Sequence, residues 1–168
     1  MSDFKRKLFL ALISTVVYTA AFNQPAAAYL KALKYIKHQN TDKNMVVSDT
    51  IIHLPFSNFD REISKIWNKN TNAVMNLLDS VDNAQEHQTF VLDKFKNLKI
   101  TGKEPTQIVY FSNFYSFMVI GEIMQLKDRW GRLSHRSQAS FNQSTQYLFV
   151  FDEKYKLKKV FEIKIAYD

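Results

Sequence analysis

The chain has 168 residues, a formal net charge of +7, and a composition that is 46% hydrophobic and 23% charged. Such a chain is long enough to fold as one domain around a core, and its 14 Phe and 8 Tyr exclude an intrinsically disordered chain. The absence of cysteine excludes disulfides and a lipid-modified N-terminal cysteine.

The first 28 residues have the three parts of a secretory signal peptide. Lys5, Arg6 and Lys7 form a basic stretch, residues 8–22 form an apolar run, and residues 25–28 supply small side chains for cleavage. The apolar run is shorter than the roughly 20 residues that cross a bilayer. We therefore predict a signal peptide over residues 1–28, a single mature domain over residues 29–168, and an exported protein that is periplasmic or secreted. A retained membrane anchor or a buried N-terminal helix is the alternative.

Helices dominate the first half of the predicted domain. Apolar residues recur at helical spacing over residues 26–38, and a β-rich run follows at residues 50–54. The same helical spacing then predicts one long helix over residues 60–81 and another over residues 83–98.

Strands dominate the second half, where the hydrophobic period changes to two. The predicted strands cover residues 107–111, 115–120, 137–151 and 161–167. Several are apolar on both faces, so the sheet must curl around a pocket or present its second face to a partner. The order of elements predicts an α+β fold, in which N-terminal helices pack on a curved, cone-shaped antiparallel sheet of four to five strands, as in a cystatin-like roll.

This order of elements resembles the nuclear-transport-factor-2-like superfamily, in its SnoaL-like or ketosteroid-isomerase-like branch. The segments that carry the resemblance are residues 48–55, the turn at 112–113 and the ending at 147–157. The resemblance implies a cone in which the sheet and helices enclose an apolar cavity. It also implies use of that cavity by isomerases, dehydratases and cyclases, for ligand binding, or as a scaffold for assembly.

The resemblance further implies a general base that faces a hydrogen-bond donor across the cavity. Asp49 and His53 are four residues apart on one predicted strand, which places them on the same face, and Tyr115 is a phenolic donor. These three are the candidate catalytic residues, although His53 could equally be structural and Asp49 a turn or cap residue. The candidate ligand-binding residues are aromatic: Trp67, Tyr110, Phe117, Tyr147 and Phe149.

The polar loop at residues 127–133 is a candidate interface, because Trp130 lies between Arg129 and Arg132 and these residue types are favoured at interface centres. A cation–π stack within the loop is the alternative. His135 is close in sequence to Asp128 and Arg129, which indicates either a polar site or a capping cluster. No metal or cofactor is predicted, because the four histidines are isolated and no glycine-rich phosphate loop is present.

The sequence favours an exported, non-catalytic domain that binds an apolar small molecule or a protein partner, with a homodimer through the open sheet face as one form. The scattered lysines argue against a nucleic-acid partner. One alternative is a cofactor-free SnoaL-like isomerase or lyase with an Asp or His base and a Tyr donor. Another is a component of an envelope secretion assembly, which requires a retained N-terminal segment and brings the domain to a membrane.

Overall fold

The computed structural model describes residues 26–40, 44–85, 90–91, 105–126, 135–140 and 142–167. The basic and apolar parts of the predicted signal peptide lie outside the described residues, and so does the loop with Arg129, Trp130 and Arg132. No helix in the described ranges has the length and apolar character needed to cross a membrane.

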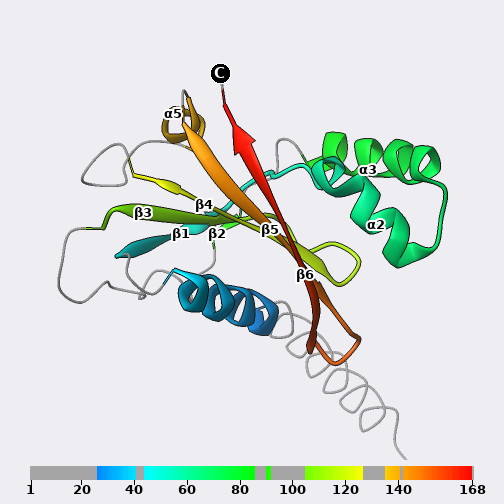
Figure 1. Ribbon diagram of the computed structural model, residues 1–168, viewed down its shortest axis with the longest axis horizontal. Helices are drawn as coiled ribbons and strands as arrows, with labels where there is room; N and C mark the ends of the chain where they lie inside the picture. The colour runs from blue at the N-terminus through cyan, green and yellow to red at the C-terminus, as the bar shows by residue number, and fades with distance from the viewer. Residues whose placement is uncertain are drawn as a thin grey trace, which may run out of the picture.

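Within the described part of the chain, the strands form one six-stranded sheet with the order β2-β1-β3-β4-β5-β6 (Figure 1). Their bounds are β1 (Met45–Ile51), β2 (Phe90–Val91), β3 (Gln107–Phe111), β4 (Met118–Gln125), β5 (Gln143–Phe151) and β6 (Leu157–Ala166). The α+β fold class is confirmed, and β3 to β6 form the predicted antiparallel meander.

The predicted sheet was antiparallel throughout its four to five strands, and the structure corrects the orientation of one strand. β1 runs parallel to β3, with Met45 opposite Gln107, so the sheet is mixed. Parallel neighbours need a long crossover connection, and here helices η1, α2 and α3 lie in the chain between β1 and β3. The sixth strand is β2, at an edge beside β1, where a helix over residues 83–98 was expected. Phe and Val are strand-forming residues, and β2 pairs with β1 along one of its two sides.

The described helices are residues 26–39, η1 (Phe56–Phe59), α2 (Asp60–Trp67), α3 (Thr71–Gln85) and α5 (His135–Ala139). The single helix predicted over residues 60–81 is in fact two helices. Asn68 takes a left-handed conformation (φ 51°) at the end of α2 and stops it. Ile63 of α2 and Val74 and Leu78 of α3 pack into the same apolar cluster. Their spacing in the sequence therefore looks like that of a single helix.

The start of the strand predicted over residues 137–151 is also corrected, because residues 135–139 form α5. The Asn142 side chain donates hydrogen bonds to the carbonyl oxygens of Gln138 and Gln125, which ties the end of α5 to β4 before β5 begins. The strand predicted at residues 115–120 begins later, at Met118, and continues to Gln125.

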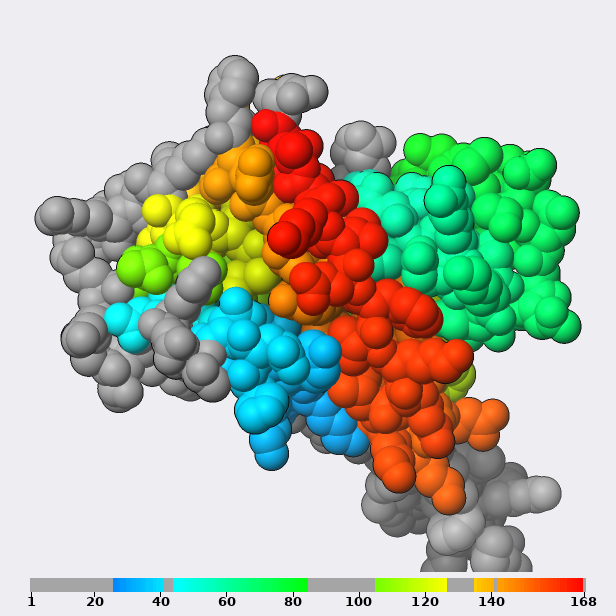
Figure 2. All heavy atoms as spheres, viewed as in Figure 1, coloured from blue at the N-terminus to red at the C-terminus, as the bar shows by residue number. Residues whose placement is uncertain are grey.

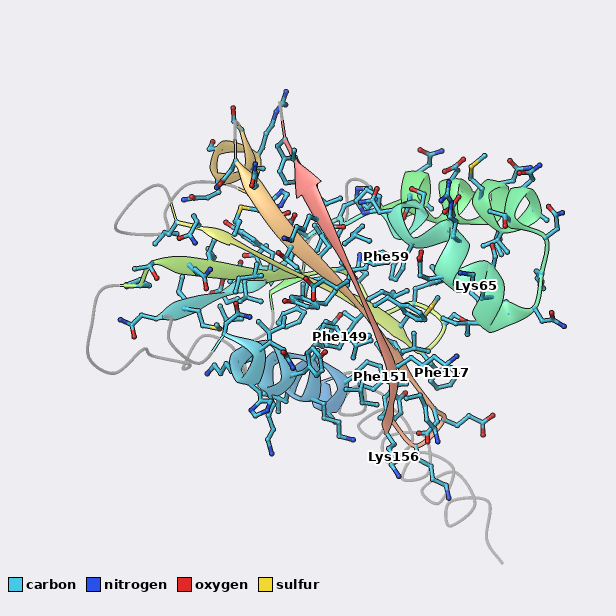
Figure 3. All side chains as sticks on the ribbon, viewed as in Figure 1. Phe59, Lys65, Phe117, Phe149, Phe151 and Lys156 are labelled. Carbon is cyan, nitrogen blue, oxygen red and sulfur yellow. The ribbon has the colours of Figure 1, made fainter. Side chains whose placement is uncertain are left out.

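Helices cover both faces of the sheet (Figure 1). Helix 26–39 packs Tyr29, Leu33 and Ile36 against one face, with Phe111 and Phe149. Helices η1, α2 and α3 pack Phe56, Phe59, Ile63, Val74 and Leu78 against the other face, and α5 adds Ala139 beside Ile108 and Met124. Figure 3 shows Phe149 and Phe151 on the side of helix 26–39 and Phe59 beside α2. The two apolar strand faces are therefore covered by the chain's own helices.

Gly121 of β4 allows helix 26–39 to approach the sheet closely. A Cβ at this position would lie 2.9 Å from both Ile36 Cδ1 and Phe111 Cε1, and 3.1 Å from Phe149 Cε2. These distances are shorter than ordinary van der Waals contact, so a larger residue would push the helix or the rings apart.

Candidate functional site

The structure does not bring the three predicted catalytic residues together. Asp49 accepts a hydrogen bond from the neighbouring Thr50 hydroxyl, at 3.2 Å. The ring of Tyr115 packs against Phe56, with 5.8 Å between the ring centroids. β1 ends at Ile51, so the strand alternation that was expected to align Asp49 with His53 does not extend to His53.

His53 instead lies near a carboxylate that has a structural role. Its Nε2 is 3.7 Å from Asp82 Oδ1, which is the distance of an ion pair rather than of a hydrogen bond. The two oxygens of Asp82 accept the backbone N–H groups of Phe56 and Ser57, at 2.9 and 3.0 Å. Asp82 of α3 thus caps η1, whose own first residues offer no side-chain cap.

The five aromatic candidates are also dispersed. Tyr147 and Phe149 lie together on the face that helix 26–39 covers, with ring centroids 6.1 Å apart. Tyr110 lies on the opposite face, and Trp67 borders the cluster of η1, α2 and α3. Phe117 lies in a turn and is 38% exposed.

A buried polar cluster lies between the two apolar clusters on the α3 and α5 side of the sheet, and its centre is Glu122 of β4, which is 0% exposed. Its Oε2 lies 2.6 Å from His135 Nε2. Its Oε1 accepts hydrogen bonds from Ser144 and Tyr167, both at 2.5 Å, and from Gln146 Nε2 at 3.2 Å. The buried polar cluster is therefore Glu122, His135, Ser144, Gln146 and Tyr167.

Strand register explains this convergence. Glu122 stands directly opposite Tyr110 of β3 and Gln146 of β5, so the three side chains share one face. α5 then places the His135 ring edge-on to Tyr110 and Tyr167, with centroid distances of 4.9 and 6.1 Å. η1 contributes Asn58, whose amide donates to Gln146 Oε1 at 3.1 Å.

The cluster favours the ionised form of Glu122 although its side chain is buried. Burial pushes the pKa of Glu122 upward, but the hydrogen bond and charge of His135 and the hydrogen bonds from Ser144 and Tyr167 outweigh it, so the pKa lies below its ordinary value. Burial, and then the negative charge of Glu122, raise the pKa of Tyr167. The same two causes raise the pKa of Tyr110 to about 12.

The geometry of the cluster indicates that Glu122 has a structural role and does not act as a general base. Both oxygens of Glu122 are occupied by protein donors, and a carboxylate with a lowered pKa is a poor proton acceptor. Two open hollows of about 500 and 470 Å³ are present, one lined by Asn40, Ser144 and Lys164 and one between α2 and α3 beside Lys65. In the described ranges, no group of three or more His, Asp or Glu side chains is placed to hold a metal ion.

Glu122 was not among the predicted site residues, although the sequence contains a signal for it. Glu122 is the one charged residue between Met118 and Met124, a run that is otherwise apolar. A charge in such a run is buried and therefore needs partners nearby. His135 was singled out, but with Asp128 and Arg129, whereas its partner in the structure is Glu122.

A second feature is an aromatic tip, which consists of Phe114, Phe117, Phe151 and Tyr155. The Phe114 ring contacts those of Phe117, Phe151 and Tyr155 at centroid distances of 6.3, 6.3 and 5.7 Å. Phe117 and Tyr155 are 6.0 Å apart. The tip joins the turn before β4 to the turn between β5 and β6, and Phe117 is its most exposed member.

Both turns hold the tip in an unusual backbone conformation. Ser116 and Phe117 have φ angles of 45° and 61°, and Tyr115 and Met118 exchange backbone hydrogen bonds around them, which is the pattern of a type I′ turn. Asn and Gly are the favoured residues in such a turn, and a bulky side chain there is an outlier. Tyr155 also has a positive φ of 55°, in a turn that Asp152 organises through the N–H groups of Lys154 and Lys156.

The fold thus defines the class of this protein as an α+β domain with helices on both faces of a mixed sheet. No family model matches the chain, and no curated protein or solved structure matches it.

Proposed function

We propose that this chain is an exported, non-catalytic binding domain that engages its partner through the aromatic tip. The observation that carries the proposal is Phe117, a large apolar side chain that is 38% exposed and lies in a left-handed turn. Strained conformations of this kind persist where the surrounding structure enforces them, and they concentrate at functional sites. Two turns that hold aromatic residues in such conformations at one end of the molecule favour a binding role for that end.

The packing of the interior favours binding at the protein surface over binding in an enclosed cavity. The middle of each sheet face is filled by helices, and the rings once expected to line a common cavity lie on opposite faces. The candidate acid–base residues Asp49, His53 and Tyr115 each contact a different neighbour. The resemblance to the SnoaL-like branch stays a prediction, and the proposal corresponds to the non-catalytic use of such a fold.

Site-directed photo-crosslinking of the full chain in the cells that produce it tests this proposal. A photoreactive phenylalanine analogue replaces Ser116 beside Phe117 or, as the matched control, the exposed Asn72 on α3. We expect adducts from position 116 and none from position 72. Equal labelling at the two positions contradicts the proposal.

A further inference from the structure

We infer that the partner of the aromatic tip is an anionic lipid surface. This inference rests on the proposed function, because it names what the same surface binds. The residues around the tip, its shape and the position of helix 26–39 beside it support this partner.

The tip combines exposed aromatic surface with a ring of lysines. Lysines 31, 154, 156, 158 and 159 are all exposed, and Lys31 donates a hydrogen bond to the Tyr155 carbonyl oxygen. The acids nearby are Asp152 and Glu153, and Asp152 is already paired with Lys158 at 3.3 Å and with two backbone N–H groups. Aromatic rings that enter the interface while lysines reach lipid phosphates are typical of membrane-surface binding.

The shape of the tip suits a membrane. The β5–β6 hairpin projects past the ends of the other strands, and its surface stands out beside helix 26–39 (Figures 1 and 2). Figure 3 shows Phe117 and Lys156 at this same end. A stable protein interface buries about 800 Å² on each partner, which two projecting turns supply poorly, whereas insertion into lipid headgroups needs only a small convex surface.

The chain enters the domain at this end. Tyr29 donates a hydrogen bond to the Ser112 carbonyl oxygen, and Lys31 reaches Tyr155, so the first turns of helix 26–39 adjoin the tip. Only residues 23–25 separate the helix from the apolar run at residues 8–22, and three residues span about 10 Å at most. Ala28 is fully buried in the apolar cluster that helix 26–39 forms with the sheet, which favours the uncleaved form of this segment. If this segment is retained as the alternative membrane anchor, it holds the tip near the lipid surface and raises its effective concentration there.

Fluorescence quenching on the full chain in lipid vesicles tests this inference. The chain has no cysteine, so Ser116→Cys, or Asn72→Cys as control, carries a single environment-sensitive label. The vesicles contain phosphatidylcholine with phosphatidylglycerol, or phosphatidylcholine alone. We expect lipid-borne quenchers to reach the label at position 116 in the anionic vesicles, and iodide in the water to reach the label at position 72 in both.

Variants of the lysines and of Phe117 test the electrostatic and the apolar contributions separately. Lys154→Gln and Lys156→Gln should each lower the equilibrium constant for docking of the tip by about fivefold, whereas Lys65→Gln on α2 should leave it unchanged. Phe117→Asn should also weaken docking, because Asn keeps the left-handed turn but removes the ring. If that variant fails to fold, the two lysine variants still decide the matter.

Two results would overturn the inference in different ways. A label at position 116 that iodide reaches as freely as the one at position 72, together with a protein adduct from the crosslinker at 116, would leave the proposed function standing with a protein partner. If iodide reaches the label at position 116 as freely as the one at position 72 and no adduct forms at position 116, both the proposed function and the lipid partner are contradicted.

Discussion

We expect Glu122 to make the stability of this protein sensitive to acid. Its pKa is lowered in the folded state, so the stabilisation is complete above the pKa of the unfolded side chain, about 4.3, and is lost as the pH falls through the lower folded value. We expect Glu122→Gln to lower the free energy of unfolding at neutral pH by about 2 kcal/mol and to flatten its decline in acid.

Urea denaturation at a series of pH values measures this effect. Glu162→Gln on the exposed side of β6 is the matched control and should leave both the stability and its pH dependence unchanged. If the free energy of unfolding falls as steeply in acid for Glu122→Gln as for the natural chain, groups other than Glu122 cause this fall.

Tyr110 and Tyr167 provide a contrast on either side of Glu122. The Tyr167 hydroxyl donates to Glu122, whereas the buried Tyr110 hydroxyl has no hydrogen-bond partner in the described part of the chain. Tyr167→Phe should therefore lower the free energy of unfolding by about 1–3 kcal/mol, and Tyr110→Phe should leave it unchanged or raise it slightly. Thermal denaturation of the two variants side by side checks this, and equal losses would contradict the assigned hydrogen bonds.

At the scale of elements, the type I′ turn at Ser116 and Phe117 departs from the residues that such a turn favours. Asn tolerates the left-handed conformation better than Ser, while a β-branched residue tolerates it less. Ser116→Asn should raise the free energy of unfolding by about 0.5–1 kcal/mol, and Ser116→Val should lower it. Chemical denaturation measures both, and a loss of stability in Ser116→Asn would mean that the Ser116 side chain contributes more than its backbone conformation.

The sequence predicted elements best where periodicity is local. The meander from β3 to β6 and helix 26–39 follow from patterns that one segment carries by itself. The break at Asn68 was missed because α2 and α3 bury their apolar residues in one cluster, and so imitate a single helix. The parallel pairing of β1 with β3 depends on a crossover, which no local pattern records.

The buried polar cluster was hidden for a related reason. Its five members come from two neighbouring strands, the end of the chain and α5, so only the register of the sheet brings them together. Local spacing pointed to Asp49 and His53 instead, which are close in sequence but lie on either side of the end of β1. A lone Glu in an apolar strand is the signal that the sequence does contain.

For the whole molecule, helix 26–39 extends across the predicted cleavage position. Ala28 is fully buried against the sheet, so a chain that begins at residue 29 loses this contact and the first helical residues. We expect that chain to be less stable by about 1 kcal/mol than a chain that begins at residue 26. Urea denaturation of the two chains compares them directly, and identical midpoints would show that residues 26–28 are dispensable for folding.

The mixed sheet also sets an order of assembly in time. β5 and β6 are neighbours in the chain and can pair as soon as both exist, whereas β1 must wait for β3, more than fifty residues later. Helix 26–39, which is synthesised before every strand of the sheet, packs against Phe149 and Phe151 of β5. We therefore expect this helix to dock late, although it is synthesised before the strands, and its apolar face to depend on chaperones until β5 has been synthesised.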